Sequence, residues 1–210
     1  MKKSYIYFIF LSLMLLAFTG CGSNQPDPPE KVVENFLKAI KEQNFASAKT
    51  YYVENLDNMA NFRNQVEDIS PSVADALFKK LGDFTYTVGK SQLSDTDSSK
   101  ATVDVTLVCH NLGKTFETTV LDYIRTDLEM TFDGAKSDDI VKETETLLVK
   151  QINESTETFT QDVTISLTKE KDTWKLDKIS ENPDLLNALS GNIIYTIDKL
   201  SAQLESLPSA

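Results

Sequence analysis

The chain has 210 residues, of which 32 are acidic and 21 are basic, so its formal net charge at pH 7 is −11. A field of that sign repels nucleic-acid phosphates, which argues against a nucleic-acid-binding protein. With one histidine and two cysteines, the chain also lacks a His/Cys cluster for zinc.

The N-terminus has the three parts of a secretory signal. Lys2 and Lys3 precede a mostly apolar run over residues 5–18, and two small residues lie directly before Cys21. The run has 14 residues, whereas a helix needs about 20 to cross the hydrocarbon core. We therefore expect residues 1–20 to be a cleaved signal peptide. An ordinary signal peptide that is cut elsewhere and an uncleaved anchor are the alternatives.

The segment Phe18-Thr19-Gly20-Cys21 resembles the lipobox of bacterial lipoproteins, with Phe18 at the position where the family usually has leucine. The resemblance implies that Cys21 becomes the first residue and carries a diacylglycerol and an N-acyl chain such as palmitate. Two acyl chains are enough for stable anchoring. The sequence thus predicts a lipid-anchored protein on the extracytoplasmic face of the cell membrane. Loss of the two lysines changes its formal charge to −13.

Residues 21–29 form the lipidated N-terminus and a tether, because the segment GSNQPDPP after Cys21 is polar and rich in proline. Residues 30–210 are expected to fold as a single domain, since we find no further linker and no internal repeat. With Cys21 lipidated, Cys109 is the only other cysteine, so no intrachain disulfide can form. A packed core must stabilise the domain instead.

The first part of the domain has helical patterns. Val32, Phe36 and Ile40 recur every four residues, which predicts an amphipathic helix that begins near Pro29. Further helices are expected over residues 45–53 and 73–81, the latter entered through Ser70-Pro71.

Strand patterns follow. Apolar side chains alternate with polar ones over residues 84–88 and 103–109, with a solvated loop over residues 91–100 between them. Residues 159–167 and 174–176 repeat the pattern on either side of a polar turn, which predicts an antiparallel hairpin.

Helical spacing returns between the second and third strands. It predicts helices over residues 116–128 and 140–152, interrupted at Asp133-Gly134, with a short strand over residues 115–121 as an alternative to the start of the first. A regular apolar stripe over residues 185–204 predicts one C-terminal helix after Asn182-Pro183-Asp184. The fold class is therefore α+β. N-terminal helices pack on a curved antiparallel sheet, with a helical insertion between strands and a C-terminal helix.

The segment PEKVVENFLKAI at residues 29–40, followed by NFASA at residues 44–48, resembles the opening of nuclear transport factor 2-like (cystatin-like) domains. The resemblance is to lipoproteins of unknown function from Gram-positive bacteria, and the Trp174-Lys175-Leu176 strand is similar too. It implies a bent sheet that forms a cone with the helices, often around a cavity. Enzymes of this superfamily place Asp, His or Tyr inside the cone, but no such set maps onto this sequence.

His110 lies next to Cys109, which raises the hypothesis of a Cys/His nucleophile. Adjacent residues on a strand point to opposite faces, so Cys109 is expected in the core and His110 on the other side. We interpret Cys109 as structural and His110 as a strand-end residue in a loop or on the rim of the cone.

Other motifs give no catalytic, cofactor or metal site. The acidic groups at residues 95–97 and 138–139 lack the glycine and the distal glutamate of a calcium loop, so a solvated loop and a helix start are the favoured interpretations. Ser166 and Lys169 match Ser-x-x-Lys, but on a strand their side chains point to opposite faces. Glycines from Gly82 onward are isolated, so the sequence does not support a phosphate-cradling loop.

Several aromatic or titratable residues are candidates for ligand binding, although core packing is the favoured role for the aromatic ones. These candidates are Tyr51, Tyr52, Tyr86, His110 and Trp174.

The sequence favours a non-enzymatic module that binds an envelope protein or a small ligand near the membrane. The alternative is an enzyme that uses carboxylate or tyrosine residues in the cone for acid/base or hydrolytic work, and a third possibility is a spacer. A cavity with buried Asp, Glu or His favours the enzyme, whereas one filled by Phe, Leu and Val argues against it.

Overall fold

The computed structural model describes residues 26–53, 57–132 and 136–205. The expected signal peptide and Cys21 lie outside these residues. The fold is α+β, as predicted, with one antiparallel sheet of strand order β1-β2-β3-β4. Within the described ranges, no helix combines the length and the apolar character that crossing a membrane requires.

Helices precede the strands at the start of the described chain, and a pair of helices separates the first two strands from the last two. The elements are α2 (Pro29–Lys41), α3 (Phe45–Lys49), α4 (Asp57–Ile69), α5 (Pro71–Leu81), β1 (Thr85–Leu93), β2 (Lys100–His110), α6 (Leu112–Phe132), α7 (Ser137–Glu154), β3 (Thr158–Glu170), β4 (Thr173–Leu176), the 3-10 helix η2 (Ile179–Glu181), α8 (Pro183–Leu189) and α9 (Ile193–Glu205).

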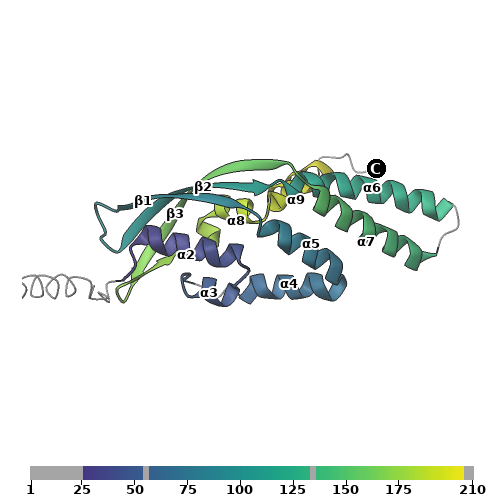
Figure 1. Ribbon diagram of the computed structural model, residues 1–210. Coiled ribbons are helices and arrows are strands. Elements are labelled where there is room, and N and C mark those ends of the chain that lie inside the picture. Colours follow the sequence, from purple (N-terminus) through teal and green to yellow (C-terminus); the bar gives the residue numbers. More distant parts are fainter. Residues whose placement is uncertain (1–25, 54–56, 133–135, 206–210) are drawn as a thin grey trace, which may run out of the picture.

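The molecule is elongated (Figure 1). The sheet arches over α2 and α8 at one end, and α6 and α7 project from the other end as a pair. We call the segment 112–154, which contains α6 and α7, the arm. It leaves the sheet after His110 and returns at Thr158, and these two residues are paired neighbours on β2 and β3. The helical insertion therefore extends one strand connection without changing the register of the sheet.

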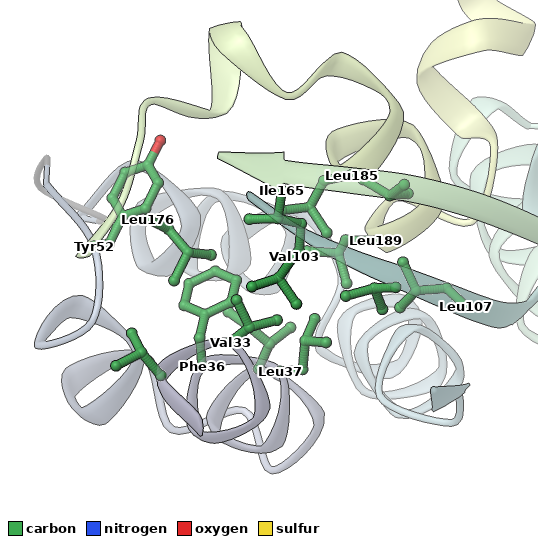
Figure 2. Packing of buried hydrophobic residues seen from close by; sticks show 14 of the residues in the cluster. Val33, Phe36, Leu37, Tyr52, Val103, Leu107, Ile165, Leu176, Leu185 and Leu189 are labelled. Atoms are coloured by element: carbon green, nitrogen blue, oxygen red, sulfur yellow. The ribbon is translucent and has the colours of Figure 1, made fainter. Parts of the chain in front are cut away.

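The core lies between α2 and the inner face of the sheet (Figure 2). Val33, Phe36 and Leu37 lie on one face of α2 because helical side chains three or four residues apart are neighbours. They point toward β2 and β3, where alternation places Leu107 and Ile165 on the same side. This side of the arched sheet is filled by apolar side chains.

The outer face of the sheet is polar and open to solvent. Thr106 donates a hydrogen bond to Asp162 across the β2–β3 pair at 2.6 Å, and Thr164 donates one to Asp104 at 2.7 Å. Cross-strand pairs of this kind stabilise a sheet locally. An antiparallel sheet with one packed and one solvated face explains the alternation seen in the sequence.

Most predicted elements are confirmed, but the alternative strand over residues 115–121 is wrong because these residues lie within α6. The second helix ends at Lys49 and not at residue 53, since the chain there becomes extended beside β4. Leu176 donates its backbone N–H to the carbonyl of Tyr51 at 2.9 Å, and Val53 donates to the carbonyl of Leu176 at 3.1 Å. Strand β1 also runs to Leu93, so the following loop is shorter than expected.

Helix α4 was not predicted, because its apolar positions are few. Phe62 and Ile69 are both exposed, and Ile69 is 86% accessible. These exposed positions differ from the buried apolar stripe that indicates an amphipathic helix.

The prediction of one C-terminal helix is wrong, since the chain turns between α8 and α9. Gly191 and Asn192 both have positive φ angles, of 62° and 66°. A left-handed residue after a helix ends it, and glycine and asparagine adopt that conformation most readily. Leu185 and Leu189 of α8 enter the core, whereas Ile197 of α9 is 44% exposed.

Neighbouring helices brace the base of the arm. The Ser70 hydroxyl, which caps α5, donates to Glu145 of α7 at 2.7 Å, and the Lys80 ammonium donates to the carbonyl of Ser155 at 2.6 Å. On the other side, Gly113 of α6 donates its N–H to the carbonyl of Gly191 at 2.9 Å.

Gly113 allows the closest contact in this brace. A Cβ atom there would overlap the carbonyl of Asn192 and the hydroxyl of Thr196. Gly113→Ala favours an isolated helix by about 1 kcal/mol, yet we expect a net loss of about 1–3 kcal/mol in unfolding free energy because α9 must move away. Chemical denaturation measures the change. Glu129→Ala, at an exposed position of α6, is the control and should alter stability by less than about 0.5 kcal/mol. Unchanged or increased stability of the Gly113 variant would contradict the close contact.

Candidate functional site

A groove on the described surface lies between the first turns of α2 and the edge strand β1. Its volume is about 610 Å³. The lining residues are Pro28, Glu30, Lys31, Glu34, Tyr86, Val88 and Gly89. We call this the α2–β1 groove. It lies where the chain enters the domain, directly after the expected tether.

Charges of both signs line this groove. Lys31 donates a hydrogen bond to Glu34 at 2.8 Å, one helical turn further along α2, and both side chains are about half exposed. This hydrogen bond and the Glu34 charge raise the pKa of the Lys31 ammonium. The ammonium of Lys31 and the carboxylate of Glu34 therefore lie at the surface of the groove. A polar group of a ligand can bind one of them in place of the other.

Glu30 is the second carboxylate of the groove. A hydrogen bond from the Ser91 side chain, followed by backbone hydrogen bonds, lowers the pKa of the Glu30 carboxyl. Among the described residues its Oε2 atom is shielded from solvent and has no hydrogen-bond partner. Glu30 is therefore an ionised group with an unused acceptor atom, and buried acceptors of this kind are uncommon in native folds.

Tyr86 and Val88 form the sheet side of the groove. Tyr86 packs on Phe84 with ring centroids 5.9 Å apart. Burial raises the pKa of its phenol, and the carboxylates of Glu34 and Glu42 raise it further. The phenol is thus neutral at physiological pH and can donate or accept a hydrogen bond beside an apolar wall.

Two smaller polar grooves lie elsewhere on the described surface. One, of about 300 Å³, is at the base of the arm beside Lys114, which lies 2.7 Å from Glu157. The other, of about 450 Å³, is beside Lys100 and Asp177. Neither contains a tyrosine, tryptophan or histidine.

The aromatic candidates do not come together in one site. Tyr52 is buried against Phe36, with ring centroids 6.2 Å apart, and its hydroxyl accepts a hydrogen bond from the backbone of Ile179. Tyr51 packs against the same core, and Trp174 is buried in β4 with Lys169 over its ring. Of the proposed ligand-binding residues, Tyr86 is the one that lines the α2–β1 groove.

Cys109 and His110 are separated as strand geometry predicted. Cys109 is buried in the core, where burial raises the pKa of its thiol to about 11. His110 ends β2, and its Nε2 atom lies 3.0 Å from Oδ2 of Asp83, just after α5. This contact lowers the pKa of the Asp83 carboxyl. The pair joins α5 to the sheet at the base of the arm.

The acidic groups at residues 95–97 and 138–139 lie in a hairpin loop and at the start of a helix. Asp97 accepts hydrogen bonds from the backbone and hydroxyl of Ser99 in the hairpin loop. Asp138 and Asp139 lie in the first turn of α7, which confirms the helix-start interpretation and suits the helix dipole. Across the part of the chain that the structure describes, no three His, Cys, Asp or Glu side chains could share a metal ion.

The enzyme hypothesis requires titratable groups inside the arch of the sheet. The hydrophobic cluster there includes phenylalanine, leucine, valine and isoleucine side chains. Asp177, which follows β4, is a buried carboxylate of the described chain.

Sequence reasoning found Tyr86 but missed Glu30, Lys31 and Glu34. These residues lie on the flank of α2 beside its buried face, where charged residues are common on any surface helix. The available clue was Tyr86, a large side chain on the inner face of a strand that proves to be an edge.

No family model matches the sequence, and no curated protein matches it either. A solved structure with a similar backbone is that of a candidate lipoprotein, ycdA, from Bacillus subtilis. The two chains are 10% identical with a TM-score of 0.47, and the match covers 78% of this chain and 55% of the other. The chain thus matches about half the length of that protein.

The contrast between Cys109 and an accessible thiol is testable by alkylation. In the folded protein at pH 8 we expect Cys109 to resist a thiol reagent, because it is 4% exposed and its pKa is about 11. After unfolding in guanidinium chloride it should react fully. A Cys21→Ser background removes the other thiol, and Val108→Cys on the outer face provides an exposed control. Rapid reaction of Cys109 in the native state would contradict its burial.

Proposed function

We propose that this chain is a lipoprotein held through Cys21 on the extracytoplasmic face of the cell membrane, where it binds a small ligand or an envelope protein without catalysis. The observation that carries the binding role is the contrast between a filled core and an open groove. The inner face of the sheet is packed with apolar side chains, while Glu30, Glu34 and Tyr86 line a groove at its edge.

Several features of the sequence support the anchor. The lipobox-like segment ends at Cys21, and a polar, proline-rich segment of eight residues follows it. Helix α2 then begins at Pro29, and its buried residues belong to the packed core. We also propose that this domain is nuclear transport factor 2-like, on the strength of a helical start that lies under a bent antiparallel sheet.

The groove suits a ligand that carries polar groups beside an apolar portion. Carboxylates and an ammonium can fix the orientation of such a ligand, and the faces of Tyr86 and Val88 can contact its apolar part. Sites of this kind, with a few placed polar groups and an apolar wall, are typical of small-molecule binding. The position of the groove beside the proposed tether supports a binding site near the membrane surface.

The anchor is tested on protein from the native membrane. On detergent phase separation the wild type should enter the detergent phase, because two or more acyl chains hold it there, and mass spectrometry should find an acylated residue 21. Cys21→Ala should move the protein to the aqueous phase, whereas Cys109→Ser should not. A native N-terminus other than acylated residue 21 would refute the anchor.

The groove is tested by thermal shift of the mature protein across a metabolite set and by pull-down from detergent-solubilised membranes. A compound or partner that binds there should lose at least tenfold in affinity on Tyr86→Ala, since truncation removes most of one wall. Tyr195→Ala, at a tyrosine that is 59% exposed on α9, is the matched control and should bind as the wild type does. Equal binding by both variants would place the site elsewhere. No shift and no specific partner would argue against a binding module.

A further inference from the structure

One end of the molecule lies close to the expected tether, and the other end lies far from it. The chain enters α2 at the end of the sheet where the β1–β2 and β3–β4 hairpins turn, and the arm projects from the opposite end (Figure 1). Pairing confirms the direction, because Leu93 pairs with Ala101 and Glu170 with Thr173 at the hairpin turns, while His110 and Thr158 pair where the arm begins. We call the residues 89–101 and 168–176 the hairpin end.

The tether is short compared with the molecule. Seven peptide units join Cys21 to Pro28, and they span at most about 25 Å in any conformation. β2 has 11 residues and α6 has 21, so they measure about 36 Å and about 31 Å and follow one another along the long axis. The tip of the arm can reach the membrane of its own anchor only if the domain lies flat on the lipid.

Charge disfavours that flat orientation. The arm contains ten acidic and five basic residues, whereas the hairpin end contains four acidic residues and five lysines. Anionic headgroups attract nearby lysines and repel carboxylates within a Debye length of the surface. The acidic arm is therefore repelled more strongly than the hairpin end, where lysines and carboxylates nearly balance.

We propose that the anchored domain stands upright, with its hairpin end against anionic lipid headgroups and its arm directed away from the membrane. This inference rests on the proposed anchor at Cys21. Lys169 lies near the end of β3, 3.5 Å from Asp172, and Lys171 is exposed within the β3–β4 turn. Leu93, which is 59% exposed at the end of β1, adds an apolar side chain to the same surface. The upright orientation leaves the arm as the part that is most accessible to other envelope components.

The single tryptophan provides a built-in probe. Trp174 lies at the hairpin end, so energy transfer from it to dansyl-labelled headgroups reports the distance of this end from the lipid. The mature chain is coupled through the Cys21 thiol to a maleimide lipid in phosphatidylglycerol vesicles, and buried Cys109 does not compete. We expect at least threefold stronger transfer from Trp174 than from a tryptophan in the arm.

The arm probe is the double variant Trp174→Phe with Val141→Trp, because Val141 is 63% exposed on α7. Circular dichroism and thermal unfolding verify that this variant folds. Equal transfer from both probes would mean that the domain lies flat, and stronger transfer from the arm would mean that it is inverted. Either result overturns the proposal.

Hydrogen–deuterium exchange on the unmutated, vesicle-coupled chain gives a second measurement that needs no variant. Amides of residues 94–99 and 171–172 should exchange at least threefold more slowly on phosphatidylglycerol than on phosphatidylcholine vesicles, whereas amides of residues 138–143 should not change. Protection confined to the arm, or absent from the hairpin turns, would refute the orientation.

Charge reversal on α7 tests the cause. Asp138, Asp139 and Glu143 are exposed, and replacing all three by lysine in the arm-probe variant should increase its energy transfer to phosphatidylglycerol vesicles at least twofold. High salt should remove that increase. Because the maleimide lipid supplies the anchor, failure of these tests refutes the orientation alone, whereas an unacylated native Cys21 refutes the anchor.

Discussion

The packing of α2 against the inner face of the sheet is the interaction on which the rest of the structure depends. With Cys109 as a free thiol in the described chain, apolar burial must stabilise the domain. Phe36 and Leu37 are completely buried against β2 and β3, and full burial of such a side chain contributes about 1.5–3 kcal/mol. Since α2 is the first described element, its position also determines where the described chain enters the fold. The core therefore sets the location of any anchor relative to the sheet.

The same packing separates the part of the domain that is filled from the part that can bind. A sheet that arches over a helix leaves room for a cavity only where the helix withdraws from it. Val33 and Phe36 fill the centre, whereas Glu30 and Glu34, on the adjoining flank of α2, face Tyr86 across an opening. Apolar residues at those two positions would close the edge as well. The carboxylates of Glu30 and Glu34 favour hydration, so this edge lacks the apolar contacts that would close the groove.

The sequence predicts a helix or strand well when the periodic side chains of that element all pack against the same core. The alternation on β2 and the four-residue spacing in α2 predict their elements because each periodic side chain meets the same core. Helix α4 was missed because its sequence is mostly polar and its Phe62 and Ile69 side chains are exposed. The apolar stripe after Asn182 continues through the turn at Gly191, so periodicity cannot show that the two halves pack on different partners. The groove is harder still to predict, because α2 and β1 meet there only through the tertiary fold.

The position of the arm in the topology explains how this sheet can carry an extension of this size. Paired residues of β2 and β3 match along the whole ladder, from Lys100 with Thr168 to His110 with Thr158. The arm starts and ends at that last pair, so its length does not disturb the register of the sheet, and closing a longer connection costs little additional free energy. Hydrogen bonds with Ser70 and Gly191 then hold α7 and α6 against the neighbouring parts of the fold. Because the arm begins where the sheet ends, it projects from the end opposite to the one at which the chain enters α2 (Figure 1).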